Sequence, residues 1–193
     1  LVSIPLLALF IRSTEMPYTA FERGSRIIDF LLGPTVVALG YLLYEQVSQL
    51  KANAVSILTS VFAGSAVGIV SVVLIARWFS AEPALIASLE PKSVTTPIAM
   101  SIAEKSGGIP SIAAVAVIVV GIFGGIVGPF ILDRLGVTSR IARGLALGSA
   151  AHGLGTARAM ELGAVEGAIS GLAIGVMGLM TAVLVPVIEW MLG

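Results

Sequence analysis

Four long runs of apolar residues alternate with polar segments along this chain. They cover residues 27–44, 54–76, 111–132 and 167–188, and the last three contain no charged residue. A helix needs about 20 consecutive apolar residues to cross a bilayer, so each run predicts a membrane helix. Residues 1–11 are also apolar but too few to cross, and we interpret them as the end of a helix whose beginning precedes residue 1.

Two polar segments interrupt the sequence between these runs. Residues 90–97 and 149–158 each place a cation, hydroxyl groups and helix breakers between apolar stretches. Irregular backbone is tolerated at membrane depth only where it is buried in protein or lines a wet cavity. The sequence therefore predicts an all-α polytopic membrane protein. We expect a single, N-terminally truncated membrane domain over residues 1–193, a helical bundle with two discontinuous or re-entrant segments.

The two interruptions also suggest an internal structural repeat. Glu104 followed by Ile112 is echoed by Glu161 followed by Ile169, each pair trailing its interruption. Paired broken helices in two halves of a chain are the best sequence indication of a transporter's binding site. If residues 84–105 cross the membrane, one side holds seven arginines and the other only two lysines. A re-entrant hairpin reduces this bias to five against four, so the charge rule favours a crossing.

Composition supports the membrane interpretation and excludes several other classes. The chain has 193 residues, of which 57% are hydrophobic and 11% charged, and its mean hydropathy is +1.05. Soluble domains carry about a quarter charged residues. A net charge of zero argues against nucleic acid as a partner, and the absence of cysteine excludes disulfides. No catalytic constellation or phosphate loop is present, so we expect a protein that is not an enzyme and binds no cofactor beyond a coupling proton or sodium ion.

A cation in each interruption is the strongest chemical signal. Lys92 and Arg158 both stand where a helix begins again, and helix N-termini favour anions. Hydroxyl groups accompany them, and together they predict a substrate site for a compact carboxylate: Lys92, Ser93, Thr95, Thr96, Gly155, Thr156 and Arg158. In the alternative, the two cations pair with Glu90, Glu104 or Glu161 and only fix the helices to one another.

His152 and Glu161 are the candidates for binding a coupling ion. Histidine titrates near physiological pH, and a carboxylate among membrane helices can bind a proton or sodium. The neighbouring Gly153 and Gly155 suggest open backbone around His152. The alternative for His152 is a packed side chain satisfied by a backbone carbonyl, and for Glu161 a helix cap or a position in a water-filled vestibule.

Several motifs resemble the LrgB/CidB family of bacterial membrane proteins. They are Ile141-Ala142-Arg143-Gly144-Leu145-Ala146-Leu147-Gly148, then His152, Leu154-Gly155 and Glu161-Leu162, with Pro91, Thr95-Thr96 and Gly33-Pro34-Thr35-Val36-Val37-Ala38-Leu39 earlier in the chain. The resemblance implies one of two functions. One is antiholin-like control of murein hydrolase export together with a small LrgA/CidA-like membrane protein. The other is carboxylate transport, as in the related plastid glycolate/glycerate transporter.

Of these two functions, the distribution of polar residues favours transport. A pore built from oligomers needs polar stripes along whole helices, whereas polarity here is concentrated at the two interruptions. We therefore expect an ion-coupled secondary transporter of small 2-hydroxy or 2-keto monocarboxylates, of the glycolate, glycerate, pyruvate or lactate class. The resemblance places it in the bacterial cytoplasmic (inner) membrane as a multi-pass protein, and a homodimer would supply a scaffold for movement.

Overall fold

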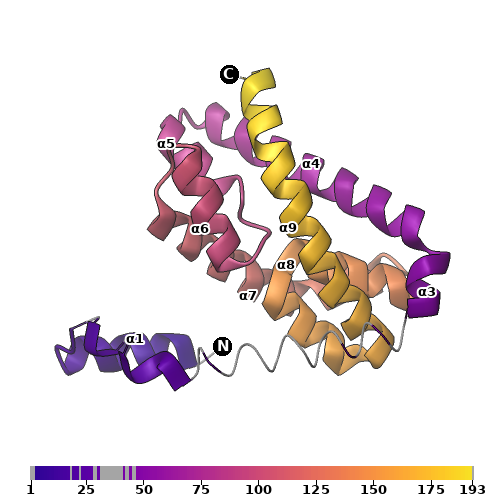
Figure 1. Ribbon diagram of the computed structural model, residues 1–193, viewed down its shortest axis with the longest axis horizontal. Coiled ribbons are helices and arrows are strands. Elements are labelled where there is room, and N and C mark those ends of the chain that lie inside the picture. Colours follow the sequence, from indigo (N-terminus) through magenta and orange to yellow (C-terminus); the bar gives the residue numbers. More distant parts are fainter. Residues whose placement is uncertain are drawn as a thin grey trace. The chain divides into compact units, whose positions relative to one another are not determined.

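The computed structural model describes residues 3–17, 19–21, 23–27, 30, 41, 44 and 47–192 (Figure 1). These residues form eight α-helices and contain no strand, which confirms the predicted all-α class. The chain divides into two compact units, Leu1–Tyr41 and Leu42–Gly193, and each is described by itself. The predicted membrane helix at residues 27–44 lies largely outside the described residues.

The described part of the first unit contains helix α1, Ser3–Ser13. Its side chains Leu6, Leu9 and Phe10 are exposed. The helix ends where the Thr14 hydroxyl donates a hydrogen bond to the Phe10 carbonyl at 2.8 Å. An apolar helix of 11 residues is too short to cross a bilayer alone, as the sequence indicated.

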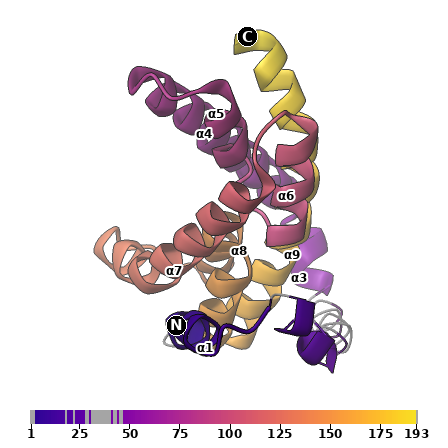
Figure 2. The same cartoon turned by 90° about the vertical axis from the view of Figure 1, so that its left-hand side faces the viewer.

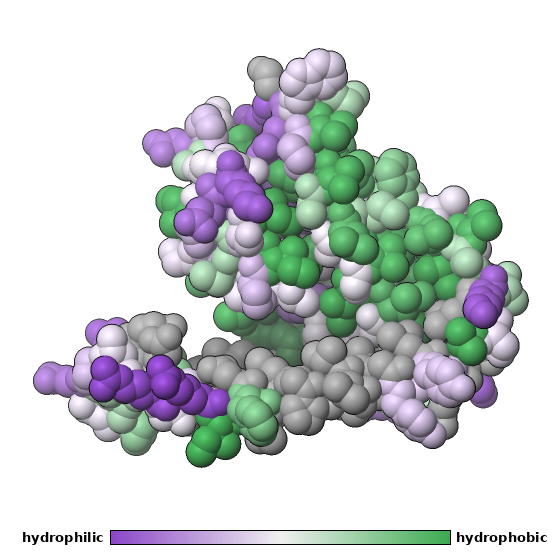
Figure 3. All heavy atoms as spheres, in the orientation of Figure 1, coloured by the Kyte–Doolittle hydropathy of each residue, from purple (hydrophilic) through white to green (hydrophobic). Residues whose placement is uncertain are grey.

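Three long apolar helices organise the second unit. They are α4 (Ala54–Trp78), α7 (Pro110–Arg134) and α9 (Ala164–Leu192), and the short α3 (Val47–Ala52) precedes α4. With 25, 25 and 29 residues, they are each about 37 to 43 Å long, enough to cross a bilayer. Hydrophobic residues cover the visible face of α4 and α9 (Figure 3). The structure thus confirms three of the four predicted membrane helices.

The first interruption forms a helical hairpin. Helices α5 (Pro83–Leu89) and α6 (Thr96–Lys105) each have proline in the first turn, where its missing N–H removes no helical hydrogen bond. Pro83 and Ser106, at the outer ends of the hairpin, line one cavity together with residues at the C-terminal ends of α4 and α9. Both outer ends therefore lie at the same end of the bundle. This geometry does not support the crossing that the charge rule favoured.

The connection between α5 and α6 reaches the middle of the bundle. Val94 is fully buried there in a core cluster with Val61 of α4, Val117 of α7 and Met177 of α9. From that point α6 runs alongside α9 toward the C-terminal end (Figure 2). Ile98 packs so closely that a Cβ on Gly178 would lie 3.0 Å from its terminal carbon.

The second interruption is a sharp kink within α8 (Arg140–Leu162). Ala151 has φ −129° and ψ 16°, and His152 has φ 42° and ψ −130°, so the helix is broken at these two residues. A positive φ in a residue with a Cβ is strained, and surrounding contacts must hold it. The predicted break at residues 149–158 is thus narrower in the structure, with regular helix on both sides.

Both halves of α8 pack against the beginning of α9. A Cβ on Gly148, before the kink, would lie 2.8 Å from the Ser170 Cα, and Thr156, after the kink, bonds to the same Ser170. A Cβ on Gly167 would lie 3.1 Å from the Cα of Met160. Small residues allow this close approach of membrane helices. Helix α8 is therefore a second hairpin, folded back on itself at His152.

Candidate functional site

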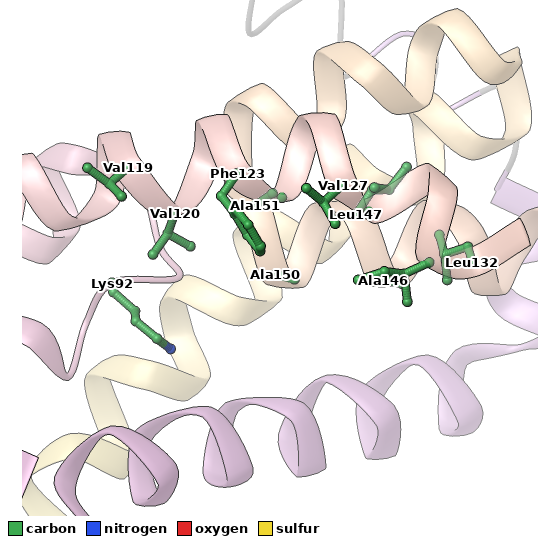
Figure 4. A pocket seen from close by; sticks show the side chains of 13 residues that line it. Lys92, Val119, Val120, Phe123, Val127, Leu132, Ala146, Leu147, Ala150 and Ala151 are labelled. Atoms are coloured by element: carbon green, nitrogen blue, oxygen red, sulfur yellow. The ribbon is translucent and has the colours of Figure 1, made fainter. Parts of the chain in front are cut away.

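The connection of the first hairpin and the kink of the second lie side by side. Lys92 and the kink residues Ala150 and Ala151 line one cavity of about 560 Å³ (Figure 4). Helix α7 supplies most of the lining and packs directly on the kink, since a Cβ on Gly124 would lie only 2.6 Å from the Ala151 Cβ. The two segments that the sequence singled out therefore share a cavity, although they are far apart in the chain.

Lys92 is the charged residue of this cavity, whose other lining residues are apolar. Its side chain is half-buried, and Nζ donates a long hydrogen bond of 3.4 Å to the Ser93 hydroxyl. Among the described residues, no carboxylate lies within 4.0 Å of Lys92. The charge is therefore not neutralised by Glu90 or Glu104, as the alternative interpretation required. A desolvated cation without a partner is unfavourable, which favours an anion in its vicinity.

The start of α6 adds hydrogen-bond donors next to Lys92 in the chain. Thr95 is the N-cap residue, but its side chain makes no capping hydrogen bond. The first turn of a helix has N–H groups without helical partners and a partial positive charge. Such an N-terminus can bind an anion, but Ser93, Thr95 and Thr96 do not line the Lys92 cavity.

His152 is packed into the bundle. It is 6% exposed, and its Nε2 lies 2.7 Å from the Val117 carbonyl oxygen of α7. Because a carbonyl only accepts, Nε2 carries the proton and donates it in this contact. Gly121 makes room for the ring, since a Cβ there would lie 2.7 Å from Nε2. The side chain is thus satisfied by a backbone carbonyl, as the packed alternative described, and this contact helps to hold the strained kink.

Gly155 and Thr156 contribute to packing of the second hairpin. A Cβ on Gly155 would lie 2.8 Å from the Ala151 Cβ, so glycine lets the two halves of α8 approach. The Thr156 hydroxyl lies 2.7 Å from that of Ser170 on α9, with both side chains buried. Neither residue lines the Lys92 cavity.

The structure does not bring Arg158 and Glu161 to this cavity. They form an ion pair with each other on the second half of α8, with side chains 45% and 64% exposed. The reason is the direction of the chain after the kink, because this half returns along α9 toward Gly163 and carries both residues away from His152. Arg158 thus pairs with Glu161, as the alternative interpretation described, but the ion pair joins two turns of one helix and does not fix two helices to one another.

Sequence reasoning did not anticipate the α7 wall of the cavity. Val120, Phe123 and Gly124 line it, and they belong to an uncharged run without chemical signal. The four-residue spacing of Gly121/Gly125 and Gly124/Gly128 was the available indication, because it predicts a helix face that another element approaches closely. In the structure that element is the kink of α8.

The fold and the site define an all-helical membrane protein whose two broken helical segments meet at a cationic cavity. Within this class, the chain belongs to the LrgB-like family, whose model matches residues 1–191, and this confirms the resemblance found in the sequence. YwbG of Bacillus subtilis (strain 168) is 38% identical over 186 residues, which cover 96% of this chain and 83% of YwbG.

Other relatives are similarly close. A Haemophilus influenzae protein is 36% identical over 185 residues, covering 96% of this chain and 80% of the relative. The antiholin-like protein LrgB of Bacillus mycoides (strain KBAB4) is 35% identical over 185 residues, with the same coverage of 96% and 80%. No solved structure matches this chain.

Proposed function

We propose that this chain is a secondary transporter of small 2-hydroxy or 2-keto monocarboxylates and acts without enzymatic chemistry. One observation carries the proposal. Lys92 lines a cavity where two broken helical segments meet, and it has no carboxylate partner among the described residues. Transporters of other folds bind anionic substrates in this way, at the ends of discontinuous helices.

The chemistry around Lys92 fits a short carboxylate. The ammonium group is a compact point charge that would bind one carboxylate oxygen. The Ser93 hydroxyl, which already accepts a hydrogen bond from Lys92, would bind the second oxygen or the neighbouring hydroxyl or keto group. Thr95 and Thr96 do not line the cavity. A cavity of about 560 Å³ has ample room for a two- or three-carbon acid, and its apolar walls suit the acid's carbon atoms.

The arrangement of the hairpins supports alternating access. The α5–α6 hairpin starts and ends where α4 and α9 end. The α8 hairpin starts where α7 ends, since Arg143 pairs with Asp133 at 2.6 Å, and it leads into the start of α9. The two hairpins would thus enter the membrane from opposite sides, in an inverted internal repeat. Inverted repeats with a central site are the basis of alternating access in many carriers.

Three further parts belong to the proposal. We propose that the protein lies in the bacterial cytoplasmic membrane as a multi-pass protein, that it couples transport to a proton or sodium ion, and that an LrgA/CidA-like membrane protein is a partner. A homodimer would provide a fixed scaffold.

The second candidate function is antiholin-like control of murein hydrolase export and autolysis. The relatives named antiholin-like protein LrgB support it. Oligomeric pores need polar stripes along membrane helices, whereas the exposed large side chains between the ends of α4, α7 and α9 are hydrophobic. This distribution is the reason that we place the transporter first.

Uptake by proteoliposomes distinguishes the two functions. We expect saturable uptake of labelled glycolate, glycerate, pyruvate or lactate. Uptake should fall about 10- to 100-fold in Lys92→Met, because a hydrogen bond to a charged group contributes about 1.5–3 kcal/mol. Lys51→Met, at an exposed position of α3, is the matched control and should transport normally. Size-graded leakage of unrelated solutes, equal in both variants, would contradict the transporter and support the second function.

A further inference from the structure

A second cavity at the opposite end of the α5–α6 hairpin contains an unusual pair of carboxyl groups. It measures about 450 Å³ and is lined by the ends of α4 and α9 and by the start of the hairpin. Glu90 and Glu189 both line it, together with Arg77. Glu90 is only 4% exposed, and its Oε2 is buried without a hydrogen-bond partner.

The two carboxyl groups line the same cavity, so the charge of one acts on the other. Two ionised carboxylates in one cavity repel one another, so a proton on one of them is favoured. The acid pair therefore has a built-in affinity for one proton.

Nearby cations do not neutralise the pair. Arg77 faces the cavity, but its Nη1 donates a hydrogen bond of 2.6 Å to the Leu192 carbonyl at the end of α9. Lys105 lines a neighbouring cavity with Glu189. Within the described part of the chain, neither cation lies within 4.0 Å of Glu90 or Glu189.

We propose that the Glu90–Glu189 pair is the proton-binding site of the transporter and controls the attachment of the α5–α6 hairpin to α9. With one proton bound, the repulsion is absent and one carboxyl group can donate a hydrogen bond to the other, which holds the hairpin against α9. When the proton leaves to water in the cavity, two carboxylates face each other and the hairpin is released. This inference rests on the proposed transport function, and it replaces His152 and Glu161 as the coupling residues.

The position of Glu90 in the chain connects the two sites. It lies two residues before Lys92, on the same connection between α5 and α6. A movement of this connection therefore changes both the proton site and the proposed substrate site. Burial, and then the charge of Glu189, raise the pKa of Glu90 to about 8, while Arg77 opposes the shift. The Glu90 carboxyl group therefore releases its proton near neutral pH.

Infrared spectroscopy tests the proton site without any transport. The full chain in lipid vesicles is titrated while the carbonyl stretch of protonated carboxyl groups is recorded. We expect a component that disappears between about pH 7 and about pH 9 and is missing in Glu90→Gln. Glu189→Gln should lower its midpoint, because a neighbouring negative charge is removed. Glu82→Gln, at the exposed start of α5, should leave it unchanged. A component that persists in Glu90→Gln would overturn the assignment.

A transport assay then tests the coupling. Wild-type vesicles should accumulate labelled lactate when the outside is acidic, up to about tenfold per pH unit for one coupled proton. Glu90→Gln should retain exchange of labelled for unlabelled lactate but lose this accumulation, and Glu82→Gln should behave as wild type. Accumulation retained in Glu90→Gln would refute the inference and leave the transporter intact. Wild-type vesicles that neither exchange nor accumulate any of the four acids would refute the proposed function itself, whatever the infrared result.

Discussion

Gly155→Ala should open the second hairpin, because the space inside the kink of α8 is filled. The added methyl carbon would overlap the Leu147 carbonyl oxygen and lie 2.9 Å from the carbonyl carbon. It would also lie 2.8 Å from the Ala151 Cβ, whereas ordinary contacts are 3.4–4 Å. The two halves of α8 would therefore have to separate by roughly 0.5–1 Å.

The expected loss of stability follows from two opposing effects. Alanine favours a helix over glycine by about 1 kcal/mol, and this gain is present at any helical position. Forcing a methyl group into a packed interior costs about 1–3 kcal/mol, and here the obstructing atoms belong to the backbone, which cannot rotate away. We therefore expect Gly155→Ala to be less stable than wild type by up to about 2 kcal/mol.

Gly153→Ala is the matched control, two residues earlier in the same helix. A Cβ on Gly153 would have no atom within 4 Å, so only the helical gain applies. For a chain of this size, 1 kcal/mol corresponds to about 2–4 °C in Tm. The two variants should therefore differ by about 2–12 °C in a fluorescence-detected thermal unfolding experiment in detergent. Equal melting temperatures, or a more stable Gly155→Ala, would refute the described packing of the kink.

Three further predictions concern the buried polar groups. Gly121→Ala should displace the His152 ring from its carbonyl partner and lower the stability measured by thermal unfolding by about 1–3 kcal/mol. Gly64→Ala is the control, because a Cβ there meets no atom within 4 Å. A loss of stability in Gly121→Ala that is no greater than in Gly64→Ala would contradict the prediction. Thr156→Val should destabilise by about 1–3 kcal/mol by leaving a buried hydroxyl on α9 without its partner, and unchanged melting would show that the bond contributes nothing. The pKa of Glu90 is higher in the folded protein than its ordinary 4.5, so folding takes up a proton, and stability should be greatest below pH 4.5 and fall as pH rises to about 8. Glu90→Gln should remove this slope in pH-dependent unfolding, and an unaltered slope would assign it to another group.

The architecture could be predicted from the sequence to the extent that it depends on local pattern. Hydrophobic runs of membrane length became α4, α7 and α9, because length and apolarity alone decide that class. Proline and a cluster of polar residues marked where α5 ends and α6 begins. The charge rule favoured a crossing for residues 84–105, whereas the structure folds them into a hairpin with both outer ends at one cavity. A difference of a few arginines does not determine whether a broken segment turns back.

The composition of the site depended on geometry that no local pattern specifies. The direction of α8 after its kink is set by the dihedral angles of Ala151 and His152 and by glycine contacts with α9, and this direction separates Arg158 from Lys92. The carboxyl pair is likewise invisible in sequence, because Glu90 and Glu189 come from opposite parts of the chain. Lys92 could be identified from the sequence alone, because a cation within an interrupted apolar segment indicates a functional site whatever residues surround it in space.

The packing of α8 on α9 has a mechanical consequence. At Gly144 and Gly148 the two main chains touch with no side chain between them, so neither helix can slide or tilt alone. The second hairpin and α9 therefore behave as a single rigid block. In a carrier built in this way, the α5–α6 hairpin would move relative to this block, and a covalent link between that hairpin and α9 would be enough to prevent the movement.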